Sequence, residues 1–203
     1  AAMPAGHGKH QLLAETGIDI EQDIDSVVAG LHSGQSPEVP VVLLRGRFDA
    51  ARIESVATSR GARAEPHQGR TVLVFPQGDQ THPALAFLEP GLIALGDAAA
   101  LRRAIDTSIA NTSVVDQPEL MRLVADVNGA GNAWVIGRLD TLSQHQAVPD
   151  QVARMFPGVQ WVSASFDVGQ SVLGRVRAET AHAQAGEQLR SVVNGAVAAG
   201  RMV

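Results

Sequence analysis

Two runs of the chain, 40–48 and 132–139, are largely apolar, and each run ends in a similar corner. The corners are Gly46, Arg47 and Asp49 in the first copy and Gly137, Arg138 and Asp140 in the second. Read as a strand, the first run places Val42, Leu44 and Phe48 on one face, and the second run follows the same plan. An aspartate directly before a segment with helical spacing can accept hydrogen bonds from the first free N–H groups of a helix. Each copy therefore predicts a strand, an N-cap and a helix.

The pattern between the two copies predicts three further strands and three helices. Ile53, Val56 and Ala57 have helical spacing that ends at Gly61. The period then changes to two in three short segments, 71–75, 84–88 and 92–95. Helical spacing returns in two segments, about 97–109 and 118–127. Asp97 is the predicted cap of the first of these helices.

The strongest strand signal lies near the end of the chain, where 161–168 and 172–179 flank a Gly-Gln turn. One face of this hairpin is apolar, with Val162, Ala164 and Phe166, whereas the other is largely polar. We expect helices on the apolar side only, supplied by a C-terminal helix over about 181–200. At the other end of the chain, a short helix over 11–16 precedes a strand over 24–31, which forms a hairpin with the strand over 40–48.

These elements predict the α+β class, with two similar β-α-β-β-α halves of ferredoxin-like order. We expect an antiparallel sheet with helices mainly on one face. Residues 1–10 are interpreted as a disordered tail or the remnant of a cut or added segment, 11–115 as the first half, and 116–203 as the second half packed on the first as one compact unit.

Composition excludes several classes of function. The 203 residues contain no cysteine, which removes disulfides and thiolate chemistry, and only 3% aromatic residues. The net charge is −5 and the basic residues are scattered, so we expect no nucleic-acid partner. No apolar run approaches the roughly 20 residues of a membrane-spanning helix.

No metal, cofactor or catalytic motif is complete. The acidic run 19–25 has the spacing of a calcium loop, but Ile24 stands where the turn needs glycine and Gly30 where a glutamate belongs. His7 and His10 favour an adventitious metal contact over a functional site. We therefore expect no metal and no cofactor.

The sequence also contains no complete motif for a catalytic nucleophile or for phosphate binding. The string 30–34 (Gly-Leu-His-Ser-Gly) has the wrong spacing for a nucleophile elbow and falls in a predicted hairpin turn. Residues 129–131 (Gly-Ala-Gly) lack the third glycine of a dinucleotide loop and precede a strand. No catalytic residue is predicted.

Arginines on predicted strands are the candidate ligand-binding residues, because guanidinium groups suit carboxylate or phosphate. They are Arg45, Arg47, Arg138, Arg175 and Arg177. The alternative is that they are ordinary arginines on the solvent-facing side of a sheet. Trp134 and Trp161 favour packing over a role as a ligand platform.

Several strings together carry a family resemblance. They lie at residues 17–19, 23–27, 45–49, 86–97 and 101–106. Over roughly residues 11–180 the chain resembles uncharacterised bacterial proteins, exported from the cell and classed as domains of unknown function. The resemblance implies an extracytoplasmic location. It supplies no activity and no catalytic residue.

The leading hypothesis is a non-enzymatic extracytoplasmic module. It would bind a protein or small ligand, or form a homodimer, through the polar sheet face or an open strand edge. One alternative is a hydrolase whose site is assembled from dispersed residues such as His32, His67 and Asp79. Another is a structural repeat of a longer protein.

Overall fold

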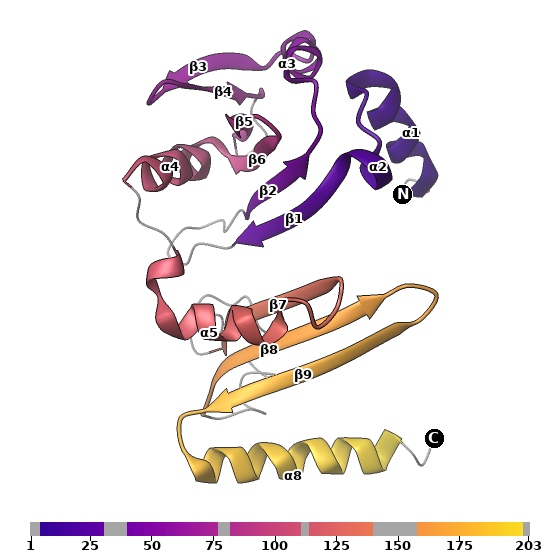
Figure 1. The fold of residues 1–203 in the computed structure, drawn as a ribbon, viewed down its shortest axis with the longest axis vertical. Helices are drawn as coiled ribbons and strands as arrows, with labels where there is room; N and C mark the ends of the chain where they lie inside the picture. Colours follow the sequence, from indigo (N-terminus) through magenta and orange to yellow (C-terminus); the bar gives the residue numbers. More distant parts are fainter. Residues whose placement is uncertain (1–4, 31–39, 77–81, 111–113, 140–157, 201–203) are drawn as a thin grey trace. The chain divides into compact units, whose positions relative to one another are not determined.

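The computed structural model describes residues 5–30, 40–76, 82–110, 114–139 and 158–200 (Figure 1). The chain divides into two compact units, residues 1–112 (unit 1) and 113–203 (unit 2), which are described separately. Both combine helices with antiparallel strands, which confirms the predicted α+β class. No helix in the described ranges is long and apolar enough to cross a lipid bilayer.

Unit 1 contains one antiparallel sheet with the strand order β1-β2-β6-β5-β4-β3. Its elements are α1 (Ala5–Thr16), α2 (Ile20–Asp23), β1 (Ile24–Gly30), β2 (Val41–Gly46), α3 (Ala50–Ser59), β3 (Arg63–His67), β4 (Arg70–Val74), β5 (Pro83–Glu89), β6 (Leu92–Asp97) and α4 (Ala98–Ile109). The predicted pairing of the strands over 24–31 and 40–48 is confirmed, because Val27 lies opposite Leu44 in an antiparallel register.

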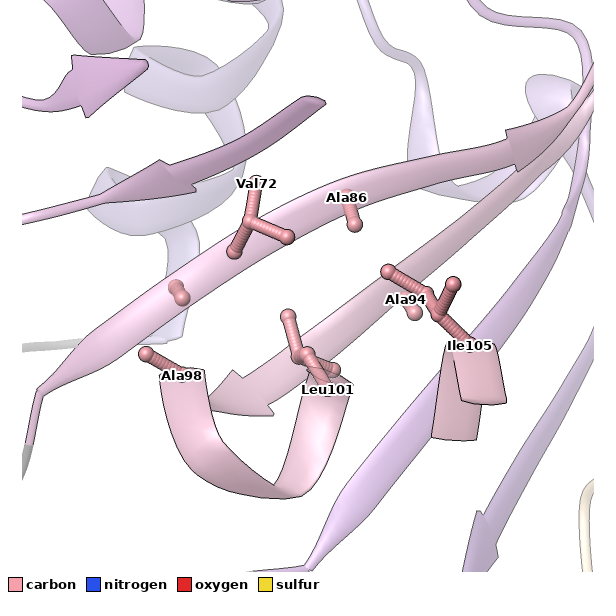
Figure 2. Packing of buried hydrophobic residues seen from close by; sticks show 7 residues of the cluster. Val72, Ala86, Ala94, Ala98, Leu101 and Ile105 are labelled. Carbon is pink, nitrogen blue, oxygen red and sulfur yellow. The ribbon is translucent and has the colours of Figure 1, made fainter. Parts of the chain in front are cut away.

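One side of the unit 1 core lies between α4 and the sheet (Figure 2). Leu101 and Ile105 of α4 are fully buried over small residues of the strands. The sheet residues of this cluster are Val72, Ala84, Ala86 and Ala94, and Ala98 completes it from α4. Alanines on the sheet let the helix approach closely, so that its large side chains fill the space.

The other face of the same sheet is covered as well. Ile53 and Ala57 of α3 belong to a second buried cluster with Leu73, Leu85 and Ile93. Consecutive residues of a strand point to opposite faces, and Val72 and Leu73 accordingly belong to different clusters. The expectation of helices mainly on one face is therefore wrong for unit 1, because both faces of its central strands are apolar.

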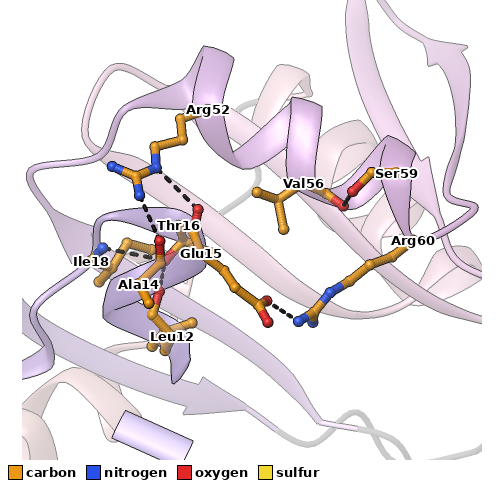
Figure 3. Close-up of polar contacts among 9 residues, drawn as sticks. All are labelled: Leu12, Ala14, Glu15, Thr16, Ile18, Arg52, Val56, Ser59 and Arg60. Atoms are coloured by element: carbon orange, nitrogen blue, oxygen red, sulfur yellow. Dashed lines mark hydrogen bonds and ion pairs between the residues drawn. The ribbon is translucent and has the colours of Figure 1, made fainter. Parts of the chain in front are cut away.

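Two arginines, one in α3 and one directly after it, contact the end of α1 (Figure 3). Arg52 donates from Nε to the carbonyl oxygen of Glu15 at 3.0 Å, and from Nη2 to that of Ala14 at 2.8 Å. Arg60, which follows α3, pairs with the Glu15 carboxylate. A cation at the last carbonyls of a helix is favourable, so these contacts attach α1 to α3. The helix begins at Ala5, earlier than the predicted start at residue 11.

Aspartates begin the helices as predicted. The Asp49 side chain accepts a hydrogen bond from the backbone N–H of Arg52 at 3.0 Å, and Asp97 accepts one from Ala99 at 2.9 Å. These contacts confirm the predicted N-caps of α3 and α4. Asp140, the corresponding residue of the second copy, lies outside the described residues.

Unit 2 contains a second antiparallel sheet with the order β7-β8-β9. Its elements are the short 3-10 helix η1 (Val114–Asp116), α5 (Pro118–Val127), β7 (Ala133–Arg138), β8 (Val159–Val168), β9 (Val172–Thr180) and α8 (Ala183–Gly200). The two units differ in sheet order within the described ranges. The predicted ferredoxin-like repeat of two similar halves is not confirmed.

The helix α5 contacts the face of β8 that carries Trp161, Ser163 and Ser165. Trp161 is 9% exposed and the two serines are 3% and 6% exposed, although the sequence pattern assigned them to the solvent side. Large apolar area on Trp161 and the small size of serine make this face suitable for packing. The prediction that helices lie on the apolar side only is therefore wrong for α5.

Candidate functional site

The five candidate arginines are divided between the two units. Arg45 and Arg47 belong to unit 1, whereas Arg138, Arg175 and Arg177 belong to unit 2. Each of the first two has an acceptor within its own unit.

In unit 1, the candidate arginines hold neighbouring segments together. Arg45 of β2 pairs with Glu89 of β5 at 2.9 Å. Arg47 donates to the backbone carbonyl of Gln22, and its Nη2 lies 3.4 Å from the carboxylate of Asp23. These arrangements fit the ordinary structural role of surface arginines.

Two of the three candidate arginines in unit 2 also have partners. The guanidinium of Arg138 lies over the ring of Trp161, 5.4 Å from its centroid, which is a cation–π geometry. Arg177 of β9 donates to Asp126 of α5 at 3.1 Å. Both contacts lie on the sheet face that α5 covers.

A further ion pair joins β9 to α5 and was not predicted. Arg122 donates two hydrogen bonds to Glu179, at 2.8 and 2.6 Å, in the bidentate geometry that favours arginine over lysine. The hydrogen bonds from Arg122 lower the pKa of Glu179, and the same contact raises the pKa of Arg122. The i,i+4 spacing of Arg122 and Asp126 was a visible signal for a charged stripe on this helix.

Arg175 differs from the other candidates. It lies opposite Ser165 in the β8–β9 register, two pairs along from Arg177 and Ser163 and on the same face. Within the part of the chain that the structure describes, Arg175 has no ion-pair partner. Its guanidinium therefore supplies a positive charge that no carboxylate of the described residues neutralises.

A small polar hollow lies beside Arg175. Its lining consists of Asp126, Val127, Ser163, Ser165, Arg175 and Arg177. The volume is about 10 Å³, which is room for a single water molecule. This hollow cannot enclose an organic substrate, but it can hold water between the serine hydroxyls and the guanidinium groups.

The charges around the hollow are unequal. Arg122, Arg175 and Arg177 provide three positive charges, and Asp126 and Glu179 provide two negative ones. The carboxylates are engaged by Arg122 and Arg177. The excess positive charge thus resides on Arg175.

Only one of the residues named for the hydrolase alternative, His67, lies in the described ranges. His67 contacts Asp106 of α4, with Nε2 and Oδ1 separated by 2.8 Å, while His32 and Asp79 lie outside the described residues. A second ion pair, between Arg102 and Glu65, also joins α4 to β3. In this setting the His67–Asp106 contact attaches the β3–β4 hairpin to α4. No group of three or more metal-ligating side chains occurs among the residues searched, which are the described ones.

Two larger hollows in unit 1 are lined by other residues. The first, of about 370 Å³, has the lining Pro40, Val42, Phe75, Pro83, Ala84, Leu95, Gly96 and Asp97. The second, of about 390 Å³, is lined by Gly61, Arg63, Glu65, Val74, Phe75, Pro76 and His82. Neither lining includes His67 or Asp106.

Asp97 at the edge of the first hollow has a perturbed acidity. Partial burial acts to raise the pKa of Asp97, but the backbone N–H groups of His82, Ala99 and Ala100 outweigh it, so the pKa lies below its ordinary value. His82 and Ala99 both donate at 2.9 Å. The carboxylate is thus engaged as a helix cap.

We expect Asp97→Ala to lower the free energy of unfolding by about 1 kcal/mol at neutral pH, because α4 loses its N-cap. A lowered folded-state pKa contributes stability above the unfolded value near 4, and this contribution disappears as pH falls through the folded pKa. The difference between wild type and variant should therefore shrink in urea titrations below about pH 4. A difference that is unchanged across that range would contradict the assignment.

Comparisons were made with models of protein families, with curated proteins and with solved structures, and none of them matches the chain.

Proposed function

We propose that the chain is a non-enzymatic binding module, and that unit 2 recognises carboxylate groups of an acidic protein partner through Arg175. The main support for the proposal is a difference among the five candidate arginines in whether each already has an interaction partner. Arg45, Arg47 and Arg177 already pair with carboxylates, and Arg138 lies over Trp161. Arg175 alone among them has no such contact within the described residues.

The geometry around Arg175 supports a carboxylate as the ligand. A guanidinium group offers donors in a planar fork that matches two carboxylate oxygens. Arg177 engages Asp126, so this nearby acidic side chain competes less for Arg175. Ser163 and Ser165 line the adjoining hollow, where a water can relay hydrogen bonds from their hydroxyls.

The size of the hollow favours recognition over catalysis. At about 10 Å³ it admits water but excludes a substrate, so the ligand group must approach Arg175 from the exposed side of β9. The net charge of −5 opposes long-range attraction of an acidic partner. Affinity should therefore depend on the short-range contact.

The proposal also includes a location outside the cytoplasm and an internal repeat. The module would work outside the cytoplasm, as the resemblance to exported bacterial proteins implies. The halves would share an internal repeat, which is supported by the glycine–arginine corners that follow similar runs in β2 and β7.

The proposal is tested with a hexaglutamate peptide and isothermal titration calorimetry on the full chain. We expect Arg175→Gln to weaken binding at least tenfold, because a hydrogen bond to a charged group contributes about 1.5–3 kcal/mol.

Arg45→Gln is the matched control, since it removes the same charge from an arginine that already pairs with Glu89. It should leave the affinity within about twofold. Equal weakening by the two substitutions would indicate a general charge effect. That result, or no measurable binding by the wild type, would overturn the Arg175 site.

A further inference from the structure

Strand β1 leaves one edge of the unit 1 sheet without a partner in the described residues. It pairs with β2 on one side and is the first strand in the sheet order. Val27 and Val28 are 57% and 48% exposed. Because consecutive side chains point to opposite faces, both faces of β1 present an apolar side chain to solvent.

The opposite edge of this sheet is protected against further pairing. Strand β3 has five residues, and Pro66 removes one backbone donor from its middle. Glu65 and His67 of this strand are tied to α4 by contacts with Arg102 and Asp106. Charges, proline and short length are devices that block strand addition.

Strand β1 has fewer of these devices, although a register shift between Ile24 and Ser26 interrupts the first part of its pairing with β2. Its seven residues, 24–30, contain no proline and one charged side chain, Asp25. Valines at its centre favour extended structure and pack well across neighbouring strands. The edge is therefore suited to accept another strand through backbone hydrogen bonds.

We propose that β1 pairs in antiparallel fashion with β1 of a second copy of this chain. The strand runs from residue 24 to residue 30, so Val27 is its midpoint. A twofold axis at Val27 places residues 26–28 of the two strands opposite each other, in the part of β1 that follows the register shift between Ile24 and Ser26. Symmetric antiparallel pairing of identical strands produces a closed, isologous contact.

Side-chain chemistry favours this register. Val27 lies opposite its own equivalent, which is a favourable pair of β-branched residues. Asp25 lies opposite Ala29 of the second copy, so the acidic side chains do not face each other. Ser26 lies opposite Val28, and no like-charge pair arises along the shared edge. In this register, the side chains of the two β1 strands can therefore face each other without charge repulsion.

The absence of cysteine allows a test of the register itself. Directly opposite residues have Cβ atoms about 4.5–5.5 Å apart, close to the separation that a disulfide needs, whereas diagonal neighbours are about 7–8 Å apart. Val27→Cys should therefore crosslink two chains under mild oxidation. Val28→Cys should crosslink at least fivefold more slowly, because its equivalents are diagonal in this register.

The assembly is measured by sedimentation velocity over a range of concentrations with the full chain. We expect a dimer whose population rises with concentration, and we expect Val27→Lys to abolish it by placing two cations opposite each other. Val27→Thr, which stays β-branched, should retain it. Val176→Lys replaces an exposed valine of unit 2 and should also retain it.

Circular dichroism of Val27→Lys checks that the exposed substitution leaves the fold intact. A wild type that stays monomeric, a dimer that survives Val27→Lys, or equal crosslinking at residues 27 and 28 would overturn the proposal. Arg175→Gln should leave the dimer unchanged, so the dimer and the proposed carboxylate site can fail separately.

Discussion

Gly46→Ala is expected to lower the free energy of unfolding by about 3 kcal/mol, at the upper end of the usual cost of adding a methyl group to a packed site. A Cβ at residue 46 would overlap the carbonyl oxygen of Asp23 and lie 3.0 Å from its carbonyl carbon. Both atoms belong to the backbone, so no side-chain rotation can relieve the overlap. The chain itself would have to move.

Hydrogen bonds fix the backbone on both sides of Gly46. Its N–H donates to the carbonyl of Gly91 at 2.9 Å, and the N–H of Arg47 donates to the carbonyl of Asp23 at 2.8 Å. Moving the chain away from Asp23 therefore breaks at least one bond of this junction between α2, β2 and the β5–β6 turn. The combined loss explains why we place the effect above that of an ordinary surface change.

Urea unfolding followed by far-ultraviolet circular dichroism measures this effect, with Gly30→Ala as the matched control. Gly30 ends β1 in the same sheet, and a Cβ there has no heavy atom within 4 Å. The control should change the free energy of unfolding by less than about 0.5 kcal/mol. Similar values for the two variants would mean that strand propensity, and not the approach of Asp23, governs residue 46.

The first corner shows how far local patterns can predict this fold. The apolar run through β2 and the side chain of Asp49 identified the strand and the helix cap, because both depend on nearby residues. The need for glycine at residue 46 arises from Asp23, which is remote in sequence. A single sequence contains no local signal for that approach.

Strand β3 was missed for a related physical reason. Its sequence, Arg-Ala-Glu-Pro-His, combines charges with a proline and has no apolar alternation. An edge strand can tolerate such residues because one of its sides needs no partner. Its pairing with β4 and its ties to α4 form only in the folded unit.

The β8–β9 hairpin of unit 2 shows that a strand pattern does not predict which face of a sheet is buried. Its alternation predicted both β8 and β9, but not which face a helix covers. Serines on β8 suggested solvent, yet they are buried beside α5, where Trp161 supplies apolar area. Burial of a polar residue depends on which element arrives from elsewhere in the chain.

The sequence predicted which residue types belong to the candidate site, but it did not predict how they are arranged in space. Arginines on strands were visible in the sequence, but their acceptors were not. Asp126 and Glu89 are distant in sequence from Arg177 and Arg45, and only the fold brings each pair together. Arg175 became the distinctive residue after those pairs were known, which no spacing rule could have shown.

Leu101→Ala is expected to lower the free energy of unfolding by about 4 kcal/mol, within the range of 2–5 kcal/mol for large-to-small changes in a core. Leu101 is fully buried and lies over Ala84, Ala86 and Ala94 of the sheet. These alanines have no side-chain torsions with which to fill the vacated volume. The cavity should therefore persist, which places the cost in the upper part of the range.

Native-state hydrogen exchange of peptides from β4, β5 and β6 is the direct measurement, because these strands lie under α4. Their slowest amides should exchange faster by a factor that corresponds to the lost stability. Ile109→Ala is the matched control, since Ile109 lies on the same helix but is 53% exposed. If both variants accelerate exchange equally, the loss of an apolar side chain anywhere on α4 has the same effect, and the buried cluster is not the main support of unit 1. If only Leu101→Ala does so, the packing of α4 against the alanine-lined sheet face determines the stability of these strands.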